Sequence, residues 1–246
     1  MKKISILRFM FPLGGVLAAT VLLTACQSPT ASGYKSLFNG KDLTGWSGRM
    51  NHWSVQDGSI TGVTTKENPA KGNNFLVWTN GTVADFELHF SYKIVANNDK
   101  SFGNSGMQYR SKDFGNFVVG GYQADFEAGK TYSGILYEEK FDGILAQRGQ
   151  KTVIKTVDGK AKVEVTGKVG DSNEIQTAIK NGDWNEYVVI AKGNHLQHFI
   201  NGKQTIDVTD EREGGKGAKS GILALQIHAG DPMTVQVKNV QIKELK

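Results

Sequence analysis

The sequence is poor in the features that mark most enzyme classes. Its 246 residues include one cysteine and four prolines, so a disulfide within the chain is excluded. No G-x-S-x-G, H-E-x-x-H, Walker or C-x-x-C motif occurs, and serine-hydrolase, zincin and nucleotide-binding functions lose their usual support. The E-x-D-x-x-E pattern of one class of sandwich-fold glucanases is also missing. Hydrolysis by two paired carboxylates is therefore not indicated.

The only long hydrophobic run lies near the N-terminus. Three basic residues precede the apolar segment 9–23, whose last residue, Leu23, begins the sequence Leu-Thr-Ala-Cys that ends at Cys26. This pattern is typical of a secretory signal, and it resembles a bacterial lipoprotein signal, in which the cysteine is lipidated. We expect a signal peptide over residues 1–25, a lipid on Cys26, a tether over 26–35, and attachment to a bacterial membrane facing the periplasm or cell surface. A plain signal peptide and an uncleaved anchor are the alternatives.

The charge of the rest of the chain is nearly balanced. Removing the three leader cations from the 29 Lys and Arg residues leaves 26 basic against 24 acidic residues. No basic tract runs through this part of the sequence, so nucleic acid is not an expected partner.

Turn signals and short alternating segments fill the chain after the leader. The sequence has 30 glycines, with Asp-Gly at 57–58 and Asn-Gly at 201–202, which are favoured in two-residue hairpin turns. Segment 172–179 is the one plausible helix, with Ser172 as its cap. About a dozen strands without a βαβ rhythm predict an all-β, antiparallel sandwich of two sheets forming one domain over 36–246.

Three segments, 104–111, 121–127 and 221–230, each combine an apolar face with a polar one. Side chains alternate between the two faces of a strand. If the segments share a sheet, six side chains form one wall: Gln108, Arg110, Gln123, Asp125, Gln226 and His228. A solvated outer face is the alternative, but such faces usually favour Lys, Glu and Thr, so we favour a recognition wall.

An amide-rich wall suits a sugar. Its hydroxyls pair with amides, and we expect Asn104, which begins the first of the three strands, to be one of the substrate-binding residues. Its ring packs on aromatic side chains, for which Trp78, Tyr109 and Tyr137 are candidates, and a place in the core is the alternative for each. Segment 131–149 contains Glu138 and Glu139. We expect it to form a loop that covers the cleft or, alternatively, a charged surface turn.

Seven stretches carry a family resemblance. In order, they are FNGKDLTGW, NSGMQYRS, GYQADFE, SGILYEE, DWNEYVVIAKGNHLQHFING, LALQIHAG and VKNVQIKEL. Across 36–246 the chain resembles the bacterial 3-keto-disaccharide hydrolase domain family. The resemblance implies a concanavalin A-like jelly-roll sandwich, secretion or lipid attachment, and action on glycosides oxidised at C3 of a glucose unit. One departure is Ser91, where members often carry an acid.

Such a substrate needs no strong acid pair. A C3 ketone acidifies the C2 proton, a modest base removes it, the enolate expels the C1 oxygen, and water then adds. We expect His228 or Asp125 to be the base and Arg110 to neutralise the enolate. The side chains expected to bind hydroxyl groups are Gln108, Gln123 and Gln226.

Two alternatives stay open at this point. A divalent cation held by His228, Asp125 and Glu138 would replace Arg110 as the enolate stabiliser. Alternatively, the protein is a carbohydrate-binding, lectin-like lipoprotein without catalysis, or a scaffold or adhesion lipoprotein, because the fold alone does not determine function.

Overall fold

The computed structural model describes residues 33–213 and 217–246. The expected signal peptide 1–25, the lipidated Cys26 and most of the tether 26–35 lie outside these residues and stay predictions, as does the membrane location. Within the described residues, no helix has the length and apolar character needed to cross a membrane.

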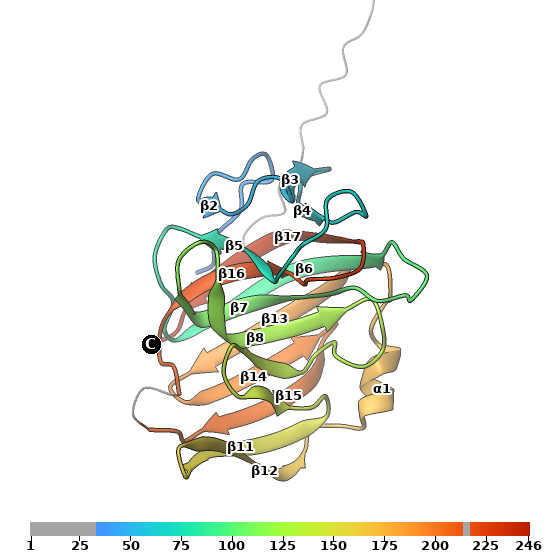
Figure 1. The fold of residues 1–246 in the computed structure, drawn as a ribbon. Coiled ribbons are helices and arrows are strands. Elements are labelled where there is room, and N and C mark those ends of the chain that lie inside the picture. The colour runs from blue at the N-terminus through green and yellow to red at the C-terminus, as the bar shows by residue number, and fades with distance from the viewer. Residues whose placement is uncertain (1–32, 214–216) are drawn as a thin grey trace, which may run out of the picture.

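The described chain folds into two β-sheets that lie one behind the other (Figure 1). The larger sheet consists of β1 (Lys35–Ser36), β3 (Trp53–Gln56), β4 (Ser59–Val63), β6 (Phe86–Ala96), β11 (Gln150–Val157), β12 (Lys160–Lys168), β13 (Asn185–Lys192), β14 (His195–Ile200), β15 (Lys203–Asp210) and β17 (Met233–Glu244). The smaller sheet consists of β2 (Trp46–Ser47), β5 (Asn74–Trp78), β7 (Asn104–Asp113), β8 (Val119–Glu127), β9 (Leu136–Glu139), β10 (Gly143–Ala146) and β16 (Ile222–Ile227).

The strand order confirms the predicted jelly-roll sandwich. The larger sheet runs β12-β11-β15-β14-β13-β6-β17-β4-β3, with β1 on β17, and the smaller runs β10-β9-β8-β7-β16-β5-β2. Neighbouring strands are antiparallel throughout the described chain except β11 and β15. In the smaller sheet β7 lies between β8 and β16, so the three segments singled out in the sequence are neighbours.

The core lies between the sheets and follows the alternation of the strands. Phe90 and Tyr92 of β6 face the interior and are almost fully buried. The Phe90 ring stacks on Tyr187 of β13 with centroids 5.1 Å apart, and Tyr92 stacks on Phe126 of β8 at 4.3 Å. Each such burial stabilises the fold by about 1.5–3 kcal/mol. The aromatic contacts between β6 and β8 therefore fix the polar residues of β8 on the outer face of the smaller sheet.

The one helix in the described residues, α1 (Ser172–Thr177), is close to the expected segment, but its cap differs from the prediction. The carboxylate of Asp171 accepts hydrogen bonds from the backbone N–H groups of Asn173 at 2.8 Å and Glu174 at 3.0 Å. Asp171, rather than Ser172, is thus the N-cap, since its carboxylate satisfies donors that the first turn leaves unpaired.

Candidate functional site

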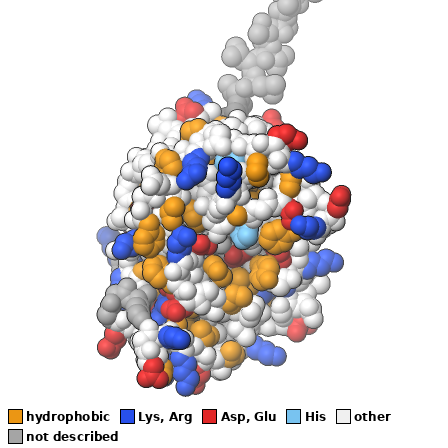
Figure 2. Space-filling model, viewed as in Figure 1, with side chains coloured by type: hydrophobic (Ala, Val, Ile, Leu, Met, Phe, Trp, Pro, Cys, Tyr) orange, Lys and Arg blue, Asp and Glu red, His pale blue; other side chains and the backbone are white. Residues whose placement is uncertain are grey.

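The outer face of the smaller sheet holds a pocket of about 350 Å³. In Figure 2 this face shows a hollow where histidine and acidic side chains lie among hydrophobic ones. Four of the six side chains predicted to form one wall line the pocket, together with the predicted Asn104 and Tyr137. The polar residues that line it are Asn73, Asn104, Gln123, Asp125, Glu139, Gln226 and His228.

Strand register explains how the amides meet. Gly106 of β7 pairs with Asp125 of β8, and Met107 pairs with Leu225 of β16. A Cβ atom on Gly106 would lie 2.4 Å from Cγ of Gln123. The missing side chain lets Gln123 reach across β7, where its Nε2 atom lies 3.4 Å from Oε1 of Gln226.

Asp125 is a buried carboxyl group held by two amides. Oδ1 accepts a hydrogen bond from Nδ2 of Asn104 at 2.7 Å, and Oδ2 accepts one from Nε2 of Gln123 at 2.9 Å. Burial raises the pKa of Asp125 to about 8, although these two hydrogen bonds lower it; the carboxylates of Glu127 and Glu139 raise it further. A carboxyl group with this pKa retains its proton in most molecules at pH 7 and is suited to act as a general acid.

His228 follows the end of β16 and is half-buried. Its Nδ1 lies 2.6 Å from the carbonyl oxygen of Ala229. A carbonyl oxygen only accepts hydrogen bonds, so Nδ1 carries the proton and the lone pair of the neutral ring is on Nε2. Nε2 has no hydrogen-bond partner within the described residues, and the Phe102 ring packs against the imidazole edge-on, with centroids 5.6 Å apart. The histidine is thus held in the tautomer that a general base needs.

Glu139 lines the pocket but is not among the site residues predicted from the sequence. Its Oε2 accepts hydrogen bonds from Nδ2 of Asn73 at 3.1 Å and Nε2 of Gln226 at 3.3 Å. Asn73 is held in turn, because its Oδ1 accepts the backbone N–H of Ala229 at 3.0 Å. Alternation from Tyr137 would have indicated Glu139, whereas nothing in the sequence marks Asn73, which lies in a loop.

Segment 131–149 contributes two four-residue strands, β9 and β10, to one side of the pocket, so the predicted covering loop was wrong for these two stretches. Tyr137 of β9 lies opposite Gln123 of β8 and lines the pocket. Its pKa is raised by burial and by the neighbouring carboxylate of Glu139. The phenol therefore keeps its proton at neutral pH and offers a hydrogen-bond donor.

Gln108 lies beside the pocket and does not line it. The side chain is fully buried, and its amide is 2.6 Å from Oε1 of Gln123. Gln108 therefore contacts its cross-strand neighbour Gln123 and not the pocket, contrary to the predicted direct contact with substrate hydroxyl groups.

Arg110 is not part of the wall, contrary to the prediction. Residue pairing on both sides of β7 shifts at this position, and Arg110 has a φ of 46°. The bulge turns the side chain away from the polar face. The guanidinium donates to the carbonyl oxygens of Ala84 and Gly193, at 2.7 Å each, and to Asp85 at 2.8 Å. Arg110 thus joins the loops at one end of the sandwich.

Glu138 lies on the opposite face of β9 from the pocket. Arg212 binds both of its carboxylate oxygens, at 2.8 and 2.9 Å. The predicted metal ligands His228, Asp125 and Glu138 are therefore not brought together. Nowhere in residues 33–213 and 217–246 do three His, Cys, Asp or Glu side chains cluster closely enough to hold a metal ion, so we derive no step through a cation.

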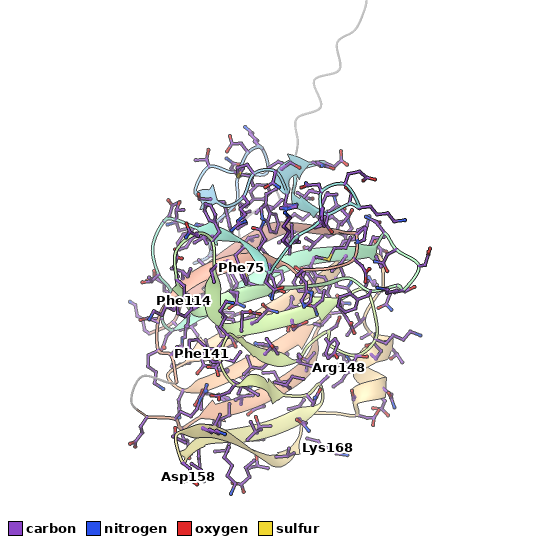
Figure 3. All side chains as sticks on the ribbon, viewed as in Figure 1. Phe75, Phe114, Phe141, Arg148, Asp158 and Lys168 are labelled. Atoms are coloured by element: carbon purple, nitrogen blue, oxygen red, sulfur yellow. The ribbon has the colours of Figure 1, made fainter. Side chains whose placement is uncertain are left out.

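Trp78 is also outside the pocket. Phe75 and Val77 of β5 lie on the outer face of the smaller sheet, packed with Val119 and Ala224 (Phe75 is labelled in Figure 3). Trp78 alternates with them and belongs to the core between the sheets. Tyr109 also belongs to this core, so the alternative to sugar stacking holds for both Trp78 and Tyr109. The aromatic side chains that line the pocket are those of Phe102, Tyr132 and Tyr137.

A domain family relates the chain to known proteins. Residues 33–243 match the model of the 3-keto-alpha-glucoside-1,2-lyase-like domain. The chain belongs to this family. Membership of the 3-keto-alpha-glucoside-1,2-lyase-like family confirms the resemblance seen in the sequence and relates the protein to carbohydrates. None of the curated proteins searched matches the chain.

Solved structures share the fold of this family member. A Parabacteroides distasonis protein named "putative glycosyl hydrolase" is 21% identical, with a TM-score of 0.53, and the match covers 88% of this chain and 95% of that one. A Bacillus subtilis protein of unknown function with a galectin-like fold is 10% identical, with a TM-score of 0.51, covering 82% and 90%. At these identities the likeness establishes the fold alone.

Proposed function

We propose that the protein cleaves the glycosidic bond of 3-keto-glucosides or 3-keto-disaccharides by C2 deprotonation, elimination and hydration. The observation that carries the proposal is the pairing, in one pocket, of a histidine whose Nε2 lone pair is available with a buried carboxyl group that retains its proton near pH 7. This pairing places a candidate base and a candidate acid in one pocket. The family, named for a 1,2-lyase activity on 3-keto-glucosides, supports the same chemistry.

In the first step Nε2 of His228 removes the C2 proton. The C2–H electron pair becomes the C2–C3 double bond of an enolate, and the negative charge moves to the C3 oxygen. None of the described residues that line the pocket is Lys or Arg, so neutral donors are proposed to stabilise this charge. The Tyr137 phenol is suited to this role because its raised pKa keeps the proton in place, and a donor directed at developing charge lowers the barrier.

In the second step the enolate re-forms the C3 ketone as a C1–C2 double bond forms and the bond between C1 and the glycosidic oxygen breaks. The Asp125 proton goes to the departing oxygen, so the leaving group departs as a neutral alcohol. Water then adds to C1 and a proton returns to C2. The sum of these steps is hydrolysis, and His228 and Asp125 return to their starting protonation states.

A lectin-like protein that binds sugar without cleaving it is the competing function. The amides of Asn104, Gln123 and Gln226, with Phe102 and Tyr132 beside them, line a pocket that also suits binding alone. What favours catalysis is the raised pKa of Asp125. Binding of neutral hydroxyl groups does not require a carboxyl group whose ionisation is opposed by burial.

Incubation with matched oxidised and unoxidised disaccharides separates the two functions. We expect release of both sugar units only from the disaccharide that carries a C3 ketone, and loss of that release in the His228→Ala variant with an unchanged melting temperature. Binding of either disaccharide without product would favour the lectin. Equal cleavage of the unoxidised disaccharide would contradict the elimination mechanism.

A further inference from the structure

A second cavity adjoins the candidate active site. It has a volume of about 630 Å³ and lies between segment 66–74 and the end of the β9 strand. Asn73 lines both cavities, and the bond from its Nδ2 to Glu139 holds this shared wall in place. The size is within the range of small-molecule sites. A glycoside whose oxidised unit occupies the first pocket would therefore extend its second unit toward this cavity.

The charges of the two cavities are opposite. The lining of the second cavity includes Arg49, Lys71 and Lys140, against the single carboxylate of Glu67, and basic side chains gather on the upper part of this face in Figure 2. Among the described residues, those that line the first pocket include the carboxyl groups of Asp125 and Glu139 and no Lys or Arg. Within the described residues neither Lys71 nor Lys140 forms an ion pair, so both ammonium groups are available to a ligand.

Polar groups without charge complete the second cavity. The amides of Asn51 and Asn68 line it and bond to each other at 3.1 Å. Nδ2 of Asn68 also donates to the backbone carbonyl of Asn51 at 2.8 Å. Two linked amides beside three cations form a surface suited to a ring that carries hydroxyl groups and one anionic group.

We propose that this second cavity is the subsite for the leaving sugar and that it selects a unit bearing an anionic group, as in a uronic acid. The inference rests on the proposed function. The Glu139 carboxylate of the first pocket repels an anion, while the cations of the second cavity attract it. The field therefore orients the substrate, with its neutral oxidised unit at His228 and its acidic unit beside Lys71 and Lys140.

The test uses three matched 3-keto-glucosides whose leaving unit is glucose, glucuronate or glucose 6-phosphate. The two anionic substrates distinguish recognition of a carboxylate from recognition of a phosphate. The test variant is Lys71→Gln/Lys140→Gln. Its control is Lys160→Gln/Lys162→Gln, which removes the same charge from two exposed positions on β12 of the larger sheet.

We expect kcat/KM of the unaltered protein to be higher for the glucuronate substrate than for the glucose substrate by about fivefold to tenfold, from two or three exposed ion pairs. The Lys71→Gln/Lys140→Gln variant should lose this preference, so that its kcat/KM for the glucuronate substrate falls to its own value for the glucose substrate, and the control variant should keep the preference. Added salt should reduce the preference. Equal rates for charged and neutral substrates, or a preference that survives in the test variant, would overturn the proposal.

Binding of methyl glucuronide and methyl glucoside, measured by calorimetry, separates this inference from the proposed reaction. Neither compound contains a ketone, so neither is a substrate. If no 3-keto-glucoside is cleaved, the proposed function fails, whereas the anionic subsite still stands if methyl glucuronide binds more tightly and that advantage disappears in Lys71→Gln/Lys140→Gln. An equal affinity for the two compounds overturns the subsite whatever the outcome of the cleavage assay.

Discussion

Two buried acidic clusters lie on opposite faces of the same edge of the smaller sheet, and they differ in their cations. On the inner face Arg212 binds Glu138 at 2.8 and 2.9 Å and Asp210 at 2.7 Å. On the outer face Asp125 and Glu139 are held only by amides. The adjacent residues Glu138 and Glu139 therefore belong to different environments, one with a compensating charge and one without.

The difference separates a structural site from a chemical one. In the inner cluster the guanidinium compensates the charge of the carboxylates that it binds. Burial lowers the pKa of Arg212, but the hydrogen bonds that it donates to Asp210 and Glu138 outweigh burial and raise it. Asp125 has no such partner, so burial raises its pKa to about 8. Perturbed pKa values cluster at functional sites. We therefore propose that the outer cluster serves catalysis and the inner one stability.

Removing the guanidinium is expected to have the largest effect on stability. Arg212→Met leaves Glu138 and Asp210 buried without a cation, which should reduce the free energy of unfolding by about 3–5 kcal/mol. Urea unfolding at pH 7 measures this loss, with Lys192→Met, at an exposed position of β13, as the control. A loss no greater than that of the control would contradict the stabilising role of the inner cluster.

Removing the acid of the outer cluster should have an effect that depends on pH. The folded-state pKa of Asp125 is raised to about 8, so the folded protein binds a proton that the unfolded chain has released above about pH 4. The resulting stability is greatest at low pH and is lost as the pH rises toward 8. Asp125→Asn has no such group.

The free energy of unfolding of the unaltered protein, relative to Asp125→Asn, should therefore fall by up to about 4 kcal/mol between pH 5 and 8. Urea titrations of both proteins at pH 5, 6.5, 8 and 9 provide the measurement. Parallel stability curves would show that Asp125 ionises normally and would remove the basis for its role as an acid.

The adjacent glutamates provide a matched pair of smaller changes. Glu138→Gln should lower the free energy of unfolding by about 1–3 kcal/mol, because Arg212 loses a charged partner, and leave kcat/KM for a 3-keto-glucoside nearly unchanged. Glu139→Gln should keep the stability and alter kcat/KM, since this carboxylate positions Asn73 and Gln226. Melting curves and steady-state rates of both variants make the test, and a reversed pattern would contradict the assignment of the two faces.

The smallest expected effect concerns the phenol of Tyr137. Tyr137→Phe removes one hydrogen-bond donor from the pocket without creating a cavity, so kcat should fall by about tenfold or more, with the melting temperature unchanged. Tyr132→Phe, at a more exposed position of the pocket rim, is the control. Equal rates for Tyr137→Phe and the unaltered protein would mean that another group stabilises the enolate.

Side-chain alternation predicted the site where the strands are regular. It placed Gln123, Asp125, Gln226 and His228 on one face, and these four residues do share the pocket. The alternation rule failed at Arg110 because a β-bulge shifts the strand register there. The residue pattern does not indicate this bulge. The sandwich was predictable because hydrophobic alternation and turn signals recur along most of the chain.

Other parts of the site depend on tertiary contacts. Segment 131–149 is predicted to be a loop. A loop has no strand register, so the prediction offers no basis for choosing between Glu138 and Glu139. Asn73 and Phe102 reach the pocket from loops, where no periodicity applies. The partner of Glu138 is Arg212, which is distant in sequence, and only the packing of the two sheets brings them together.

The most direct test of the central claim is to run the reaction of a 3-keto-disaccharide in D2O and determine the deuterium content at C2 of the released keto sugar by NMR. Elimination followed by hydration breaks the C2–H bond, so we predict one deuterium at C2 with the unaltered protein. Free 3-keto-glucose in the same buffer corrects for spontaneous exchange. Product that forms at the full rate and retains its original C2 hydrogen would contradict the account, because the bond to C1 would then have been cleaved without C2 deprotonation.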